Sequence, residues 1–254
     1  MSSNVDADSG VRLVYKNDPI VEAIVELAFV PDREWNITIP GRLYDRLQDE
    51  YPDPPKQREI VEAGLASDND GVGTFTLNRK GARVVFGAGN KLLMVGPDVI
   101  SLHSLKPYEG WGNFLPRVAK AIDSYVAVAQ PKSIAKISLR YINRVNIPKE
   151  QFSLTEYFTI TQALPDAFPT QMTSFVDRME LAYEDIPAQI AFTWATTKPA
   201  QEGQSSFVLD FDLHWIEECD IRDAIDHLKD LRRRQRAAFE SVINEELRRI
   251  FNAD

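Results

Sequence analysis

The sequence predicts an α+β protein in which one extended, curved antiparallel sheet carries helices on one of its faces. Three observations lead to this fold class. Several segments alternate apolar and polar residues with the period of a strand, and others repeat with the period of a helix. Clusters of glycine, asparagine and aspartate separate neighbouring strand segments and suit hairpin turns. The order strand, helix, antiparallel strands, helix occurs twice, which predicts pseudo-duplicated halves at about 11–131 and 132–254.

The first half begins with a strand at 19–30, in which Glu22 and Glu26 share one face while the opposite face is wholly apolar. Before it, residues 1–10 are polar and acidic, which predicts a disordered head. A helical pattern starts at Pro40 and ends before a proline cluster. Further elements of this half are strands at 59–66, 72–78, 82–86, 91–95 and 98–105 and an amphipathic helix at 111–129.

The second half repeats this order. It is predicted to contain strands at 133–147, 171–183, 188–197 and 206–216 and a capping-box turn at 153–156. Asp220 is a suitable N-cap for a closing helix that runs to about Phe251. A basic run at 231–236 interrupts the apolar stripe of this helix, so we expect a bend there, or else a single straight amphipathic helix. No Gly/Ser linker separates the halves, which predicts one unit over 1–254.

Composition excludes several classes of protein. The 254 residues carry 29 Lys+Arg against 38 Asp+Glu, and this net charge of -9 argues against a free-standing duplex DNA-binding module. One cysteine, Cys219, allows no intramolecular disulfide and no multi-cysteine metal site, as is usual in a reducing cytoplasm. No stretch is long and apolar enough for a membrane span. We therefore expect a cytoplasmic protein without a cofactor and without membrane association.

Familiar catalytic motifs are not found in the sequence. Walker A, HExxH and GxSxG patterns do not occur, and the glycine pairs at 71–73 and 87–89 lie between strands, as turns do. Asp223 and His227 share a helix face, but two ligands without a third make no metal site. Cys219 lies at a helix start, where the dipole can lower the pKa of a thiol, although a structural thiol is the simpler interpretation. We predict no catalytic residue.

Charged residues recur on one face of several predicted strands, and we call them the charged strip. One interpretation is a solvated set of cross-strand ion pairs. A second is a recognition surface whose basic residues hold phosphates or carboxylates. In both, Arg140 and Arg144 lie away from the helices and within ion-pair reach of Asp210, Asp212 or Glu180. The strip consists of Lys136, Arg140, Arg144, Arg178, Glu180, Asp210, Asp212 and His214.

A third interpretation of these strands is a metal site. Carboxylate oxygens bind hard cations, and such a cation can assist hydrolysis of a phosphate ester or anhydride. The Glu-x-Glu-x-Lys signature of the tunnel triphosphatases is not present. The ligands of this alternative would be drawn from Glu22, Glu26, Glu180, Asp210 and Asp212.

Four short segments carry a family likeness: Pro19 to Ala23, Tyr51-Pro52, Leu139 to Arg144, and Leu209 to Asp212. With them, nearly the whole chain resembles a sporadically distributed, uncharacterised family of bacterial and archaeal proteins of similar length. The resemblance implies a cytoplasmic protein in a variable genomic setting, such as a stress or defence module. It carries over no catalytic residue, ligand or partner.

The leading functional interpretation is a non-enzymatic recognition or accessory protein that binds another macromolecule, with a protein as the expected partner. A homodimer is a further expectation, because two-fold assemblies are the commonest oligomers. Its interface would use the arginines of the closing helix. The alternative function is a metal-dependent phosphohydrolase that acts on a nucleotide or polyphosphate. The interface residues expected are Arg232, Arg233, Arg234 and Arg236.

Overall fold

The computed structural model describes residues 15–67, 73–160, 165–169 and 173–253, and the predicted head at 1–10 lies outside these ranges. Within them the chain forms nine strands and four α-helices. The strands are β1 (Ile20–Val30), β2 (Asp53–Ser67), β3 (Gly73–Ala88), β4 (Lys91–Gly96), β5 (Val99–Leu105), β6 (Ser133–Ile147), β7 (Val176–Ala182), β8 (Ala188–Thr197) and β9 (Ser205–Trp215). The helices are α1 (Ile39–Leu47), α2 (Trp111–Ala129), α3 (Ala224–Val242) and α4 (Glu245–Asn252), with 3₁₀ turns η1 (Leu154–Glu156) and η2 (Ile221–Asp223).

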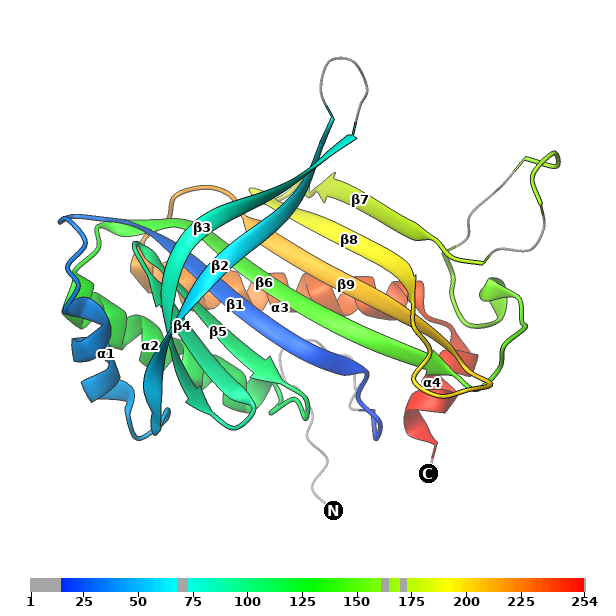
Figure 1. The fold of residues 1–254 in the computed structure, drawn as a ribbon, viewed down its shortest axis with the longest axis horizontal. Coiled ribbons are helices and arrows are strands. Elements are labelled where there is room, and N and C mark those ends of the chain that lie inside the picture. The colour runs from blue at the N-terminus through cyan, green and yellow to red at the C-terminus, as the bar shows by residue number, and fades with distance from the viewer. Residues whose placement is uncertain (1–14, 68–72, 161–164, 170–172, 254) are drawn as a thin grey trace.

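All nine strands belong to one sheet in the order β2-β3-β4-β5-β1-β6-β9-β8-β7. Every neighbouring pair is antiparallel. The four helices lie together behind this sheet and leave its other face uncovered (Figure 1). The predicted α+β class, with one antiparallel sheet and helices on one face, is therefore confirmed.

The strand order is similar in the two halves of the chain. In each half the first strand pairs with the last, β1 with β5 and β6 with β9, and the two first strands pair with each other at the centre. The halves differ in strand number, five against four, and in the element after the first strand, α1 against η1. Pseudo-duplication of the halves stays a prediction.

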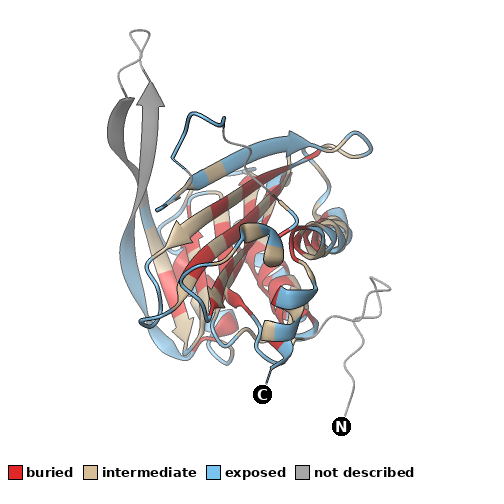
Figure 2. Ribbon diagram, turned by 90° about the vertical axis from the view of Figure 1, so that its right-hand side faces the viewer, coloured by how far each residue is buried: buried red, intermediate tan, exposed pale blue. Residues whose placement is uncertain are grey.

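Strand alternation sorts the side chains onto two faces. On β6, Ile137, Leu139 and Tyr141 are completely buried on the face toward the helices. Apolar residues of α2 and α3, among them Phe114 and Leu228, complete the same cluster. Figure 2 shows the buried segments gathered between the sheet and the helices. One core thus spans both halves of the chain, as the alternation requires.

Two local predictions are corrected. The strands expected at 72–78 and 82–86 are a single strand, β3, which pairs with β2 through two register shifts. The capping box expected at 153–156 does not form, since η1 has no side-chain cap. Glu156 instead accepts a hydrogen bond from Lys149 Nζ at 2.6 Å, and the Ser153 hydroxyl lies 2.7 Å from that of Thr155. The Ser153 and Glu156 side chains therefore bind neighbouring side chains instead of the backbone N–H groups of η1.

The bend predicted at 231–236 is wrong, because α3 runs unbroken through the basic run. The alternative, a single straight helix to about Phe251, is also wrong, because the chain leaves the helical conformation at Ile243, whose φ and ψ are -111° and 150°, and α4 follows as a separate helix. There the Thr159 N–H donates to the Val242 carbonyl at 3.0 Å, and the Asn244 N–H donates to the Tyr157 carbonyl at 3.0 Å. A backbone bridge to a distant segment, rather than the local sequence, therefore ends the helix. Asp220 caps η2 by accepting from the Arg222 N–H.

Cleavage between the halves is expected to leave them associated, because β1 is paired with β6 along its whole length. After limited proteolysis near Lys132, the two fragments should co-elute in size-exclusion chromatography. Residues 132–254 expressed alone should show no cooperative thermal unfolding, since one side of β6 and part of the core would be exposed to water. Two separately stable halves would contradict the prediction of a single unit.

Candidate functional site

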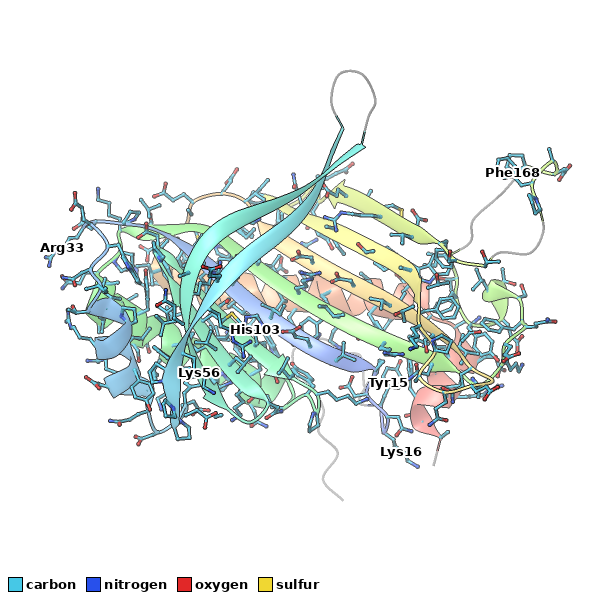
Figure 3. All side chains as sticks on the ribbon, viewed as in Figure 1. Tyr15, Lys16, Arg33, Lys56, His103 and Phe168 are labelled. Atoms are coloured by element: carbon cyan, nitrogen blue, oxygen red, sulfur yellow. The ribbon has the colours of Figure 1, made fainter. Side chains whose placement is uncertain are left out.

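The face of the sheet that carries no helix, called the open face, holds the charged strip. The register places Arg140 opposite Asp212 and beside Asp210 on the neighbouring strand, and places Arg178 opposite Thr193, which is itself opposite Asp210. Glu22 and Glu26 lie on the same face, opposite Ile142 and Ser138. Figure 3 looks onto this face and labels His103 there. The strip is thus one surface, although its strands are far apart in sequence.

The strongest pair on the open face joins Arg140 to Asp210. Arg140 Nε donates to Asp210 Oδ1 at 2.9 Å, and Arg140 Nη2 donates to Asp210 Oδ2 at 2.6 Å. This two-point contact raises the pKa of Arg140 from its ordinary value, chiefly through the hydrogen bond to Asp210. The predicted position of Arg140 is confirmed.

For Arg144 the predicted ion pair is not found in the described part of the chain. Arg144 Nη2 donates to the Lys198 carbonyl at 2.7 Å, and Arg144 Nε donates to Asn146 Oδ1 at 3.3 Å. The residue opposite Arg144 on β9 is Val208, and the nearest carboxylate along β9, that of Asp210, is bonded to Arg140. Strand alternation fixed the face of this arginine but not its partner.

A hydrogen-bonded chain on β1 and β5 was missed by the sequence interpretation. His103 Nδ1 lies 2.8 Å from Glu22 Oε1, and His103 Nε2 lies 3.1 Å from the Ser101 hydroxyl. Arg83 Nη1 donates to that hydroxyl at 3.1 Å and to Glu26 Oε2 at 2.7 Å. The local signal was the Ser-x-His spacing, which puts two polar side chains on one strand face. Their carboxylate partners become neighbours only when the sheet forms.

Carboxylate, imidazole and hydroxyl follow one another here as in a serine-hydrolase triad, a constellation recognised by geometry. However, Ser101 is only 1% exposed and its hydroxyl already accepts from Arg83, so a substrate has no access to it. The strand β5 lies between β4 and β1, so its backbone N–H groups serve the sheet and form no oxyanion hole. This set of hydrogen-bonded side chains is best explained as a structural polar network that links β1, β3 and β5.

A similar contact occurs in the second half of the sheet. His214 Nδ1 lies 2.7 Å from the Ser138 hydroxyl, and its Nε2 lies 3.4 Å from Asp212 Oδ2. Arg178 and Glu180, two residues apart on β7, pair at 2.8 Å while remaining exposed. Opposite charges therefore neutralise one another over most of the open face, with Lys136 exposed at one end.

The carboxylates of the proposed metal site do not converge. Glu22 and Asp210 each bind a basic side chain on a neighbouring strand, and Glu26 binds Arg83 of β3, beyond β4 and β5 in the sheet. In the part of the chain that the structure describes, no group of three or more histidine, cysteine, aspartate or glutamate side chains is arranged to hold a metal ion. The open face has the chemistry of an ion-pair lattice.

The arginines of α3 fold back onto their own chain. Arg234 pairs with Asp185 at 2.6 Å and with Asp230 at 2.9 Å, and Arg233 also binds Asp230. Arg232 is buried, and Arg236 is partly buried beside it. The outward basic surface that the expected homodimer would use is therefore reduced to the exposed Arg233.

The two remaining sequence candidates have structural roles. Burial raises the pKa of the Cys219 thiol to about 11, with Asp223, Asp220 and Glu218 acting in the same direction, so the lowering considered from its helix-start position does not occur. The ring of His227 stacks on Trp215 at 3.7 Å between centroids.

The strand β7 ends the sheet and has few neighbours. Val176 is 76% exposed on the open face, and Leu181 and Met179, on the opposite face, are 55% and 38% exposed. In the described ranges no strand pairs with the outer side of β7. An open edge with apolar side chains on both faces can pair with another chain. Arg178 and Glu180 lie between these apolar residues, and charges of this kind restrict which strands can pair there.

The hydrogen-bonding groups of the β7 backbone point alternately toward β8 and away from it. The Tyr183 N–H donates to the Ala188 carbonyl, and the Thr196 N–H donates to the Phe175 carbonyl. Hydrogen-bonded and non-hydrogen-bonded pairs alternate along an antiparallel ladder. The backbone N–H and C=O groups of the odd-numbered residues of β7 therefore bond to β8, and those of the even-numbered residues point outward from the sheet edge. The backbone N–H groups of Arg178 and Glu180 therefore point away from the sheet.

Comparison with known proteins adds no assignment. No known family profile matches the chain, and no curated protein is significantly similar to it. The family resemblance noted in the sequence therefore stays a prediction. None of the helices in the described ranges is long and apolar enough to cross a membrane.

The Arg140 to Asp210 contact is expected to contribute measurably to folding. A double-mutant cycle of Arg140→Ala and Asp210→Ala should give a coupling free energy of about 1–2 kcal/mol, because a charge-assisted two-point hydrogen bond is partly shielded from water. The matched control is the exposed Arg178 and Glu180 pair, for which about 0–0.5 kcal/mol is expected. Equal coupling for the two pairs, measured by urea unfolding, would contradict this ranking.

Cys219 is expected to be a slow nucleophile in the folded chain. With a pKa of about 11, only about one thiol in a thousand is ionised at pH 8, against roughly a quarter for an unperturbed cysteine. The rate of alkylation by iodoacetamide should therefore rise up to about pH 11, whereas in urea it should level off near pH 9. A plateau near pH 9 in the native protein would show that burial does not protect the thiol.

Proposed function

We propose that this protein is a non-enzymatic recognition protein that binds another protein, and that the partner adds a strand to β7. The observation that carries the proposal is the uncovered edge of β7, where Val176, Met179 and Leu181 leave apolar surface exposed on both faces. Strand addition supplies main-chain hydrogen bonds for affinity and side-chain contacts on alternate positions for specificity. Both kinds of group are available at this edge.

Charge favours a protein over a nucleic acid as the partner. A surface that binds phosphates needs uncompensated basic residues. On the open face, Arg140 and Arg83 are each paired with a carboxylate, and the chain as a whole carries a charge of -9. A partner strand with an acidic residue facing Arg178 and a basic residue facing Glu180 fits the edge.

The alternative function, metal-dependent hydrolysis of a phosphate ester or anhydride, has no specific observation in its favour. Its candidate ligands are engaged by basic partners, and Ser101 and His103 lie in a shielded network. The setting in a stress or defence module rests on the family resemblance alone.

The test begins with a photo-crosslinking amino acid at Leu181, on the apolar side of the edge. Crosslinking in cells should give a discrete product, which mass spectrometry identifies. The same amino acid at Ile37, which is also highly exposed but precedes α1, is the matched control. A product of twice the chain mass would make the partner a second copy, and light scattering would then show a dimer.

Glu180→Pro is expected to weaken binding of the purified partner at least tenfold, or about 1.4 kcal/mol. Proline removes the outward backbone donor, while the ladder to β8 is kept, since prolines are tolerated on edge strands. Glu180→Ala removes the side chain but keeps the donor, so its affinity should stay within about fivefold of the unaltered chain, since one cross-strand charge pair contributes at most about 1 kcal/mol. Affinity is measured by calorimetry.

Two results would refute strand addition at β7. One is equal crosslinking from Leu181 and Ile37. The other is an affinity of the Glu180→Pro variant that equals that of Glu180→Ala while both fold. If the proline variant unfolds, Leu181→Lys serves instead, because it leaves the backbone intact and places a charge in the apolar contact.

A further inference from the structure

A cavity of about 570 Å³ lies on the helix side of the sheet, remote from the open face. Its walls come from residues 15–20, from the start of α2 and from the middle of α3. Aromatic side chains form much of the lining, among them Tyr15, Tyr108, Trp111 and Phe239. Figure 3 labels Tyr15 near α4, where its ring packs against Phe251. The volume is within the range of roughly 300–1,000 Å³ that is typical of small-molecule sites.

The guanidinium of Arg232 lines this cavity, where Asp18 acts on it electrostatically but forms no salt bridge with it. Arg232 is only 9% exposed, its Nη1 donates to Gln235, and its buried Nε has no hydrogen-bond partner among the described residues. The guanidinium carbon lies 4.2 Å from the ring centre of Tyr141 and 5.8 Å from that of Trp111. Among the described residues no acidic group lies within ion-pair distance of Arg232. A buried cation in this state has unsatisfied capacity for an anion.

A second buried arginine, Arg117, is a useful comparison because its guanidinium has a full set of hydrogen-bond partners. Arg117, on α2, is 4% exposed. It donates to Glu109 Oε1 from Nε at 3.0 Å, to the Tyr51 hydroxyl at 2.6 Å and to the His103 carbonyl at 3.0 Å. Arg117 is saturated by its own chain, whereas Arg232 is not.

The start of α2 supplies further anion donors at the same place. Gly110, Trp111 and Gly112 line the cavity, and the helix has neither a side-chain cap nor an acidic residue in its first turn. The N–H groups of Trp111 and Gly112 are in the first turn, where the helix offers them no carbonyl acceptor. The helix dipole is also positive at this end. Gly110 has φ of 82°, and an added Cβ at Gly112 would meet nothing within 4 Å. Free space therefore adjoins the start of α2, whose first N–H groups have no acceptor within the helix.

The acidic residues of the cavity are largely neutralised elsewhere. Glu109 pairs with Arg117, and Glu240 pairs with Arg248 and accepts from the Tyr15 hydroxyl. The remaining acid is Asp18, whose Oδ1 accepts from the Ile20 N–H at 2.9 Å. Burial raises the pKa of Asp18 from its ordinary value, while the Ile20 N–H and the charges of Arg232, Lys106 and Arg236 act in the opposite direction. Asp18 is thus the one cavity carboxyl that acts on Arg232 without a salt bridge to it among the described residues, and its raised pKa favours the neutral form, which opposes a bound anion less.

We propose that this cavity binds a small carboxylic acid with an aromatic or apolar body, whose carboxylate lies between Arg232 and the first turn of α2. A guanidinium and two adjacent N–H groups match the two oxygens of a carboxylate. The aromatic walls cover the body of the ligand. One buried arginine balances a single negative charge, whereas a phosphate monoester carries nearly two at neutral pH. This site is independent of the recognition function proposed for β7.

The test uses the full chain and three probe acids: benzoate, phenylacetate and indole-3-acetate. Binding is measured by calorimetry and by the shift in melting temperature at millimolar probe concentration. At least one acid should bind and raise the melting temperature. Benzamide and phenylacetamide, which keep the ring and lose the charge, should bind at least tenfold more weakly. Inorganic phosphate should bind more weakly than the best acid.

Variants locate the site. Arg232→Met should weaken binding of the best acid at least tenfold, while Arg233→Met, the exposed neighbour on the same helix, should leave the affinity unchanged. Gly112→Asp places a carboxylate of the chain at the start of α2, a favourable helix position, and should abolish binding without loss of melting temperature. Gly112→Ala is its uncharged control and should bind the acid within a few-fold of the unaltered chain.

Several results would overturn the proposal. These are no binding of any probe acid to the unaltered chain, amides that bind as tightly as acids, phosphate that binds more tightly than every acid, or equal affinities for the Arg232→Met and Arg233→Met variants. If Arg232→Met fails to fold, the Gly112→Asp and Gly112→Ala pair decides the question alone.

Discussion

The antiparallel pairing of β1 with β6 is the constraint on which the rest of the structure depends. It joins the two halves of the chain at the centre of the sheet, and its register places Val25 opposite Leu139 and Leu27 opposite Ile137 on the core face. The same register places Glu26 opposite Ser138 on the open face. A slip of one residue would exchange these faces along the whole strand. Core packing and the polar network are therefore two consequences of one alignment.

Charge is arranged differently on the two faces of this sheet. On the open face, water is close and opposite charges on adjacent strands satisfy one another, as Arg140 and Asp210 do. Such pairs contribute modestly to stability and leave little net charge for a ligand. On the helix side, burial is deeper, and an unmatched cation has larger consequences because the surroundings screen it less. Arg232 is the side chain for which this difference matters.

Sequence alone predicted those elements whose pattern is local. Alternation identified β6 and β8 with their observed bounds, and the apolar stripe did the same for α2. The end of α3 at Ile243 was not predictable in this way, because its cause is a backbone bridge to Phe158, far away in the chain. Arg232 illustrates the same limit for the site. It lies in a basic run that resembles a solvated helix face, and its burial depends on the packing of α3 under Tyr141 on β6.

The cost of Arg232 links its burial to its proposed role. Removing a guanidinium from water is unfavourable by several kcal/mol unless hydrogen bonds and an opposite charge compensate, and Arg117 shows that this chain can provide both. Contact with the rings of Tyr141 and Trp111 offsets only about 0.5–2 kcal/mol. A methionine or leucine in place of Arg232 would fill similar space without the penalty. Asp18 offsets part of this cost electrostatically. A carboxylate bound as we propose would offset more of it, because it would also accept hydrogen bonds from the guanidinium.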